Sequence, residues 1–364
     1  MRLVDQEPFA EAARLMSVCN ACRYCEGVCA VFPAMELCQE FDQANLSYLA
    51  NLCHGCSACF YDCQYAPPHE FNINLPAILA QVRTRSYQDY AWPRSFSGAF
   101  ERAVPVAAWL ACLSVVAFVI LLSLRNGTAA MANADGSGFF YRLMPHITMV
   151  AVFGTIFLLA VLSLALGLRN FSHSQKTSSS GNGLGALWRA MRDAGSLRYL
   201  GRHGGCVVGE DIPADWRRRF HHLTFYGFLL CFASTGVATL YHYLLGLEAP
   251  YRWFQLPVIL GVLGGLGLVL GTTGLALQNL RRPPVLGEDA GLGKAFLMML
   301  WLTGVSGLML LALRATTAMG LLLALHLGIV FALFATLPYG KFVHGLYRYA
   351  ALVRHAREQR TSTH

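Results

Sequence analysis

The sequence predicts an all-α protein in two parts, a helical N-terminal domain at 1–102 and a bundle of six membrane-spanning helices at 103–364. Three observations predict this fold class. Eight of the 12 cysteines fall in two short runs near the N-terminus. Apolar residues make up 55% of the chain and charged residues only 13%, whereas a soluble domain carries about 25% charged residues. Beyond residue 102, the apolar residues gather in stretches long enough to cross a bilayer.

The two cysteine runs share one spacing, C-x2-C-x2-C-x3-C. Three thiolates of such a run bind one 4Fe-4S cluster, and the fourth cysteine binds the neighbouring cluster. Residues 36–51, between the runs, have helical character, so we expect a helical dicluster ferredoxin domain. The predicted ligands are Cys19, Cys22, Cys25 and Cys63 for cluster 1, and Cys53, Cys56, Cys59 and Cys29 for cluster 2.

Disulfides and zinc are the other common uses of closely spaced cysteines. Disulfides need an oxidising compartment, and nothing at the N-terminus resembles a signal peptide. Zinc sites usually pair two C-x2-C knuckles, which leaves the third and fourth cysteine of each run without a use. Two 4Fe-4S clusters use all eight cysteines, and they indicate that the chain carries electrons.

Six stretches after residue 102 are long enough to cross about 30 Å of hydrocarbon at about 1.5 Å per residue. Their interiors contain no Asp or Glu, which disfavours a transporter or proton pump. Gly267 and Gly271 form a small-xxx-small pair for close helix contact, and Pro338 should kink or end the last span. The predicted spans are 103–124, 144–168, 221–246, 256–280, 295–313 and 318–344, the last two joined by a short turn near Arg314.

Basic residues predict the orientation of the bundle. The asymmetry places the N-terminal domain and both termini in the cytoplasm, with a long cytoplasmic loop at 169–220. The net charge of +8 is then a topology signal, and no nucleic-acid-binding motif accompanies it. The inner segments 169–220, 281–294 and 339–364 hold 9, 3 and 5 Lys and Arg, and the outer segments 125–143, 247–255 and 314–317 hold 2, 1 and 1.

Histidines in the spans are candidates for the next electron carrier, because a b-type haem takes imidazole ligands from facing helices. His326 and His344 are 18 residues apart in the last span, so on a straight helix they share one face about 27 Å apart. The third span runs in the opposite direction and holds His221, His222 and His242. Matching depths predict that His221 or His222 faces His344. They also predict that His242 faces His326, with one haem b near each surface.

Other histidines and cysteines have simpler interpretations. His146 begins the second span and is expected at the membrane interface, and His203 is expected at the surface of the 169–220 loop. In that loop, 187–200 has helical spacing with exposed arginines. It should lie on the inner membrane surface, against the cluster domain, or free in solvent. The four cysteines outside the runs, expected to be structural thiols, are Cys38, Cys112, Cys206 and Cys231.

Several segments resemble the tricarballylate/citrate-utilisation protein B family. They include Cys19-Asn-Ala-Cys-Arg-Tyr-Cys-Glu-Gly-Val-Cys29, Cys63-Gln-Tyr-Ala-Pro-Pro-His-Glu-Phe71 and Phe220-His-His-Leu-Thr-Phe-Tyr-Gly227. The resemblance implies a protein of a bacterial inner (plasma) membrane that accepts electrons from a cytoplasmic FAD-dependent dehydrogenase, a tricarballylate dehydrogenase, and passes them to the respiratory chain. We expect quinone to be the acceptor there. The segment 326–344 separately resembles the last haem-bearing span of the membrane subunit of respiratory nitrate reductase.

The chain has no dinucleotide-binding fingerprint and no catalytic constellation for an organic acid. We therefore expect an electron-transfer subunit of an oxidoreductase with no substrate-oxidising site of its own, and no motif locates a quinone site. Two rival functions use some of the same features. A cluster-based redox sensor would not need histidines at both membrane faces, and an accessory to organic-acid transport would need polar groups near the midplane.

Overall fold

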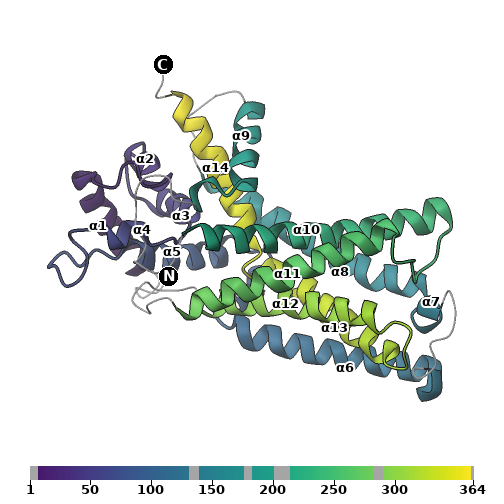
Figure 1. Ribbon diagram of the computed structural model, residues 1–364. Helices are drawn as coiled ribbons and strands as arrows, with labels where there is room; N and C mark the ends of the chain where they lie inside the picture. Colours follow the sequence, from purple (N-terminus) through teal and green to yellow (C-terminus); the bar gives the residue numbers. More distant parts are fainter. Residues whose placement is uncertain (1–6, 131–138, 176–182, 201–213, 282–289, 362–364) are drawn as a thin grey trace.

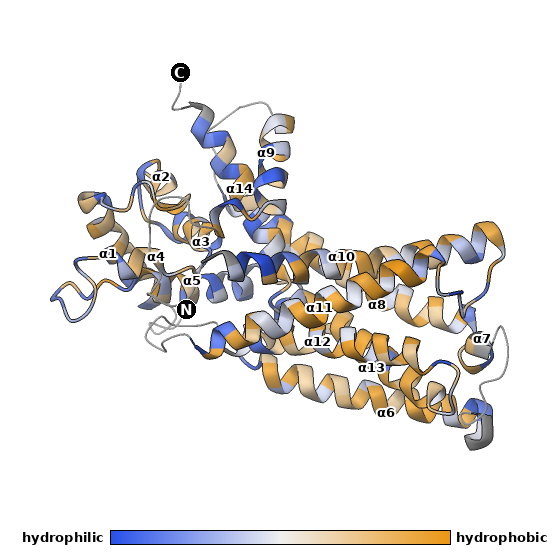
Figure 2. Ribbon diagram, in the orientation of Figure 1, coloured by the Kyte–Doolittle hydropathy of each residue, from blue (hydrophilic) through white to orange (hydrophobic). Residues whose placement is uncertain are grey.

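The computed structural model describes residues 7–130, 139–175, 183–200, 214–281 and 290–361, and all regular structure in these ranges is helical (Figure 1). The predicted all-α fold class is therefore confirmed. A compact group of short helices lies at one end of a long bundle (Figure 1). Figure 2 shows that the bundle is predominantly hydrophobic along its length, whereas polar residues concentrate at the end of the molecule that carries the short helices.

The N-terminal domain consists of short helices joined by the cysteine loops. Its third helix begins at Asp42, whose carboxylate accepts a hydrogen bond of 2.8 Å from the backbone nitrogen of Asn45, a common helix start. Leu15, Leu49 and Leu79, from three different helices, are almost fully buried in one core. The helices are α1 (Glu7–Cys22), α2 (Val31–Glu36), α3 (Gln43–Leu52), α4 (Ala58–Tyr61) and α5 (Leu75–Tyr90), followed by the 3-10 helix η2 (Arg94–Ala99).

The described residues contain six helices long and apolar enough to cross a membrane, as predicted. A short helix, α7 (Phe139–Leu143), precedes the second of them. The membrane helices are α6 (Ala103–Ala130), α8 (His146–Ser174), α10 (Ala214–Leu245), α11 (Leu256–Leu280), α12 (Ala290–Ala312) and α13 (Met319–Thr336).

Helices α10 and α11 pack backbone against backbone. A Cβ added at Gly264 would lie 2.7 Å from the backbone nitrogen of Cys231, and one added at Gly271 would lie 2.6 Å from that of Thr224. Gly267 belongs to the same contact, since its Cβ would lie 3.0 Å from a carbonyl oxygen of α10. The close contact predicted for Gly267 and Gly271 is therefore confirmed, and it fixes the rotation of α10 relative to α11.

The last predicted span, 318–344, is not one helix. Helix α13 ends at Thr336, and a 3-10 turn, η5 (Leu337–Tyr339), leads to extended backbone at Gly340. Pro338 lacks the backbone N–H that a continuing helix needs, so the predicted break is confirmed and the predicted end of the span at 344 is wrong. His344 consequently lies in the first turn of the next helix, α14 (Val343–Thr361).

Helix α14 belongs to the N-terminal domain in space, although it follows the last span in sequence. Ala351 and Leu352 are buried in the same core as α1, α3 and α5. The Arg354 guanidinium lies 4.0 Å from the centre of the Tyr48 ring and donates a 2.8 Å hydrogen bond to Asn45. On its other side, α14 packs against α9 (Gly183–Gly195), with the 3-10 helix η3 (Arg198–Leu200) beyond. The helix predicted at 187–200 therefore lies against the cluster domain.

Candidate iron–sulfur and haem sites

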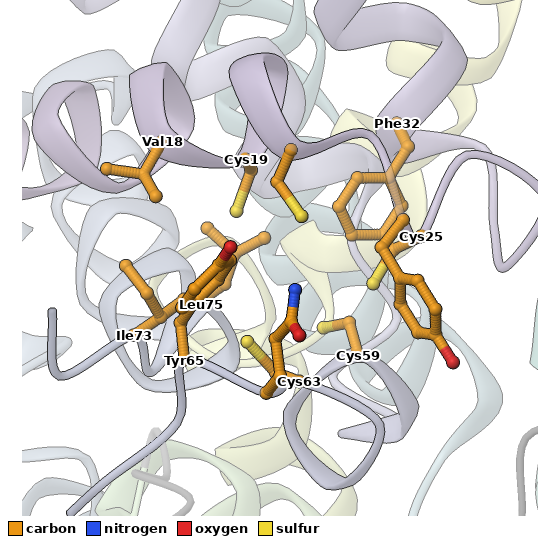
Figure 3. A pocket seen from close by; sticks show the side chains of 12 residues that line it. Val18, Cys19, Cys25, Phe32, Cys59, Cys63, Tyr65, Ile73 and Leu75 are labelled. Carbon is orange, nitrogen blue, oxygen red and sulfur yellow. The ribbon is translucent and has the colours of Figure 1, made fainter. Parts of the chain in front are cut away.

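In the first group of thiols, Cys63 of the second run lies beside the cysteines of the first run. A cavity is lined by Cys19, Cys22, Cys25 and Cys63 together with Cys59, and the sulfurs of Cys19 and Cys63 point into it (Figure 3). Burial, followed by the neighbouring thiolates led by Cys63, raises the pKa of Cys19 to about 12. Burial, followed by the neighbouring thiolates, likewise raises the pKa of Cys25 to about 11. Buried and crowded thiols of this kind are suited to a cationic metal centre, which removes the electrostatic cost of ionising them.

In the second group of thiols, Cys29 of the first run lies near the cysteines of the second run. Burial and the nearby thiolates of Cys56 and Cys53 raise the pKa of Cys29. Burial and the thiolates of Cys29, Cys53 and Cys56 likewise raise that of Cys59 well above its usual value. The structure thus exchanges the fourth cysteine between the runs, which is the crossed arrangement that the spacing predicts.

The two runs fold in the same way locally. The residue after the second cysteine has a positive φ in both, 56° at Arg23 and 68° at Ser57. Its carbonyl then accepts a hydrogen bond from the residue after the third cysteine, 3.1 Å from Glu26 and 3.0 Å from Phe60. This repeated left-handed turn reverses the chain within each run, so that the first three sulfurs can gather on one side.

A four-iron cluster and a single metal ion require different spacings of the thiols. Among the residues that the structure describes, no three His, Cys, Asp or Glu side chains converge closely enough to hold one metal ion. In a cubane each thiolate binds a different iron, so the four sulfurs stand farther apart than around zinc. A backbone N–H also points at one of these sulfurs, from Gly55 to Cys53 at 3.3 Å, a contact that stabilises thiolate charge.

Three arginines donate hydrogen bonds to the loop of the second run, and one of them, Arg217, lies on a membrane helix. Arg83 of α5 donates a 2.9 Å hydrogen bond to the Cys53 carbonyl. Arg348 of α14 donates to the carbonyls of Cys53 and Leu52, at 3.4 and 2.8 Å. Arg217 of α10 donates to the Gly55 carbonyl at 3.3 Å. Sequence reasoning missed all three, because it counted Arg217 and Arg348 only as topology signals.

His54, inside the second run, faces the membrane helices. Burial lowers its pKa well below the usual range, and the positive charge of Arg348 and the proximity of His221, Arg83 and His344 lower it further. His54 therefore lies close to His221 of α10 and His344 of α14. Its place in the motif Cys-His-Gly-Cys was visible in the sequence, but its direction was not.

His221 of α10 and His344 of α14 form the predicted inner pair. Their ring centres lie 6.3 Å apart with the ring planes at 70°. Two imidazoles on one iron would have centres roughly 6 Å apart, from a metal–nitrogen bond of about 2.0 Å on each side plus half a ring each. The Nδ1 of His344 hydrogen-bonds to the Lys341 carbonyl, so this nitrogen carries the proton and Nε2 is left to bind metal. The pair fits a haem ligand set.

His222, the alternative inner partner, turns away from this pair. Its ring lies 5.8 Å from that of Tyr226 on the same helix. Because adjacent residues on a helix point about 100° apart, only one of the two histidines can face α14. The structure selects His221.

The predicted outer pair, His242 and His326, is not formed. The His242 ring stacks on that of His146 at 3.8 Å with the planes 17° apart, which is too close for an iron between them. The Nδ1 of His326 instead lies 2.9 Å from the Ser306 hydroxyl of α12. The close glycine contact with α11 sets the rotation of α10 and turns His242 toward α8. His242 and His326 therefore do not meet, although they were predicted at the same depth. His146 begins α8, as predicted.

The remaining predicted thiols and histidine have simple positions. The Cys38 thiol donates a 3.3 Å hydrogen bond to the Ala34 carbonyl. Cys231 lies in the α10–α11 contact, and Cys112 is exposed on α6. His203 and Cys206 fall outside the described residues.

Comparisons with known proteins agree with this architecture. Residues 99–364 match the family described as citrate utilization protein B, and residues 12–89 match the citrate utilization protein B Fer4-like domain. The chain is 47% identical over 358 residues to the citrate utilization protein B of Escherichia coli, covering 97% of this chain and 93% of the relative. No solved structure matches it. With its Fer4-like cysteine domain and six apolar helices, this multi-pass iron–sulfur electron-transfer protein belongs to the citrate utilization protein B family.

Proposed function

We propose that the chain is a membrane electron-transfer protein that takes electrons from a reduced flavoprotein resembling tricarballylate dehydrogenase. Two 4Fe-4S clusters and a haem b connect that partner to the quinone pool. One observation carries this proposal: the loop of the second cysteine run is tied by Arg217 and Arg348 to α10 and α14, the helices that bear His221 and His344. A relay needs this proximity, whereas a sensor or a transport accessory does not.

The crossed cysteine groups would hold the clusters, with Cys19, Cys22, Cys25 and Cys63 around one and Cys53, Cys56, Cys59 and Cys29 around the other. When bound, the clusters supply one-electron carriers that can separate the two electrons of a reduced flavin. The left-handed turns at Arg23 and Ser57 orient the thiols. The arginine-bound carbonyls keep the second group at a fixed distance from the bundle.

His221 and His344 would bind the haem, which supplies a one-electron carrier inside the bilayer when bound. The carbonyl of Lys341 fixes the tautomer of His344. His54 lies close to this pair. Since the outer histidines do not form a ligand pair, we propose one haem where the sequence predicts two.

The flavoprotein would dock at the first cysteine run. Cys22 is exposed there, Tyr24 is 72% exposed and Phe71 is 45% exposed, and exposed aromatic residues are typical of binding surfaces. The second run is less suited to this contact, because His54 lies close to the His221–His344 pair. The domain and both termini are proposed to lie in the cytoplasm of a bacterial inner membrane, on the distribution of basic residues.

Haem analysis of the full-length protein tests the ligand assignment. His221→Ala and His344→Ala should each abolish the reduced-minus-oxidised haem spectrum and the pyridine haemochrome, while iron and acid-labile sulfide remain. His222→Ala, the neighbouring control, should keep full haem content. Haem unchanged in both ligand variants would exclude this pair and favour a cluster-based sensor.

A second measurement tests the direction of electron flow. Reduced flavoprotein partner, the full-length protein and a quinone analogue should together produce quinol, with haem reduction preceding it. The partner alone is the control, and equal quinone reduction without this chain would remove the proposed role. The partner's own acid oxidation should proceed without this chain when a dye accepts the electrons.

A further inference from the structure

A cavity in the membrane bundle belongs to none of the sites above. It lies between η2, α6, α12 and the junction of α13 with η5, and its volume is about 230 Å³. Because η2 packs against both α5 and η5, the cavity is at the end of the bundle that adjoins the N-terminal domain. It is therefore on the same side of the bundle as the His221–His344 pair.

The wall of this cavity is apolar and partly aromatic. Phe96 and Phe296 contribute flat rings to the wall, and the small side chains of Ala107 and Ala295 leave the cavity open. Phe96 is 58% exposed, so the cavity lies near the surface of the bundle. A charged or strongly polar ligand would lose its hydration here without compensation, whereas a flat apolar ring with a hydrocarbon tail would not.

Two hydroxyl groups are the polar side-chain groups in this wall. The Thr336 hydroxyl donates to the Ala332 carbonyl at 2.8 Å, and the Tyr339 hydroxyl donates to the Trp92 carbonyl at 3.1 Å. Both hydrogens are thus engaged within the protein. The Thr336 oxygen retains acceptor capacity, and the Tyr339 oxygen, which also accepts a hydrogen bond from Ser163, retains one further lone pair. Such acceptors suit a ligand that carries hydroxyl groups on an otherwise apolar ring.

The wall of the cavity continues to the histidine pair. Gly340 lines the cavity and is four residues before His344 in the sequence, so their Cα atoms are at most about 14 Å apart even in a fully extended chain. Between them, the Phe342 ring lies 6.2 Å from Phe296 of the cavity and 5.7 Å from Phe228 of α10. Electron transfer over such a short packed path needs no further carrier.

From this location and chemistry, we propose that the cavity binds the head group of an isoprenoid quinone, with the ring beside Phe296 and the oxygens near Thr336 and Tyr339. The proposal rests on the proposed function and names the place where its last step occurs. Reduction of the quinone takes two electrons, which the reduced flavoprotein supplies, and two protons from water, and two O–H bonds form. The acceptors at Thr336 and Tyr339 then bind the quinol hydroxyls.

The test fills the cavity in the full-length protein embedded in lipid nanodiscs. Ala107→Trp places an indole in the cavity, and Val116→Trp places the same group on the 54% exposed surface of the same helix. The flavoprotein first reduces the haem. Reoxidation of the haem by decylubiquinone should then be at least about tenfold slower in Ala107→Trp, which corresponds to a free-energy change of about 1.4 kcal/mol. Val116→Trp should reoxidise at the unmodified rate.

Haem reduction measured without quinone distinguishes a failure of this quinone site from a failure of the proposed function. If the unmodified protein is not reduced by the flavoprotein, the proposed function fails. If it is reduced and Ala107→Trp reoxidises normally, the cavity holds lipid or nothing, and only the quinone site is overturned.

Photolabelling of the unmodified protein keeps the test independent of folding in the variants. An azidoquinone should label peptides containing Phe296 or Tyr339, and excess decylubiquinone should remove that labelling. Competed labelling confined to other helices would overturn the assignment. Tyr339→Phe should weaken product inhibition by decylubiquinol about threefold while leaving haem content unchanged, as expected for the loss of one hydrogen bond from the quinol of about 0.7 kcal/mol.

Discussion

The two cysteine runs have the same spacing and the same local turn, yet they occupy opposite environments. The first run reaches the surface, where Cys22 and Tyr24 are exposed. The second is fixed by hydrogen bonds from three arginines, and its histidine faces the membrane helices. The equal spacing therefore predicts the same kind of ligand for both runs, whereas their surroundings differ. On the proposed function, the exposed run would receive electrons and the enclosed run would deliver them.

The largest expected effect is a difference in quinol formation between variants of the two runs, which depends on the electron donor. Cys22→Ser and Cys56→Ser should each lower cluster iron from about eight to about four atoms per chain. With reduced flavoprotein as donor, both variants should lose quinol formation. With a small viologen donor that reaches either cluster, Cys22→Ser should regain quinol formation and Cys56→Ser should not. Cys38→Ser, a thiol outside both groups, should keep all the iron. Equal rescue of the two variants would refute the assigned order.

A second effect concerns the stability of the two runs. Arg348→Met removes charged hydrogen bonds to the carbonyls of Cys53 and Leu52 and should lower the free energy of unfolding by about 3 kcal/mol. Arg14→Met, near the first run, removes an ion pair with Glu11 whose side chains are 46% and 42% exposed, and it should cost less than about 1 kcal/mol. Denaturant titration followed by cluster absorbance measures both. Similar losses would mean that the arginines do not distinguish the runs.

A third effect tests the exposed run as the docking surface. Tyr24→Ser should slow reduction by the flavoprotein about tenfold, or about 1.4 kcal/mol, the loss typical of an aromatic contact residue. Trp188→Ser on α9 removes an aromatic side chain of nearly equal exposure, 69% against 72%, and should leave the rate unchanged. Stopped-flow measurements at several partner concentrations distinguish weaker binding from slower electron transfer. A slower rate in the Trp188 variant alone would move the docking surface to α9.

The smallest expected effect is the response to salt. Residues 1–102 hold 11 acidic and 7 basic side chains, so added salt should change the association rate with a charged partner by roughly twofold to tenfold. Electron transfer from the second cluster to the haem should not change, because partly buried contacts are weakly screened. Rapid-mixing traces at two ionic strengths resolve the two steps. A salt-dependent internal step would indicate that the domain is held to the bundle by diffuse charge.

Much of the architecture could be predicted from hydropathy and spacing. The fourth span, predicted at 256–280, coincides with α11, because long apolar runs leave few alternatives. That His221 or His222 approaches His344 was also predictable, since the ends of antiparallel helices meet at one surface, but the choice between the two was left open. The outer pair was not, because depth along a helix does not determine which way a side chain faces. That rotation depends on the Gly264–Gly271 seam, which forms only when the backbones of α10 and α11 approach closely.

The arginines and His54 show a second limit of sequence reasoning. Arg83, Arg217 and Arg348 are far apart in the chain and share no motif. They bind carbonyl oxygens, which every residue possesses, so no spacing in the sequence marks their partners. The direction of His54 follows from the helices that surround it and not from the cysteines on either side.

The position of α14 sets the order in which the protein can be made. The core of the N-terminal domain includes Ala351 and Leu352, which a ribosome adds only after all six membrane helices. A nascent domain without them leaves the face of α3 around Tyr48 uncovered, since Arg354 and Glu358 complete that contact. The iron–sulfur domain therefore begins to form first and reaches its final packing last. Correct insertion of the last span becomes a precondition for a closed core at the start of the chain.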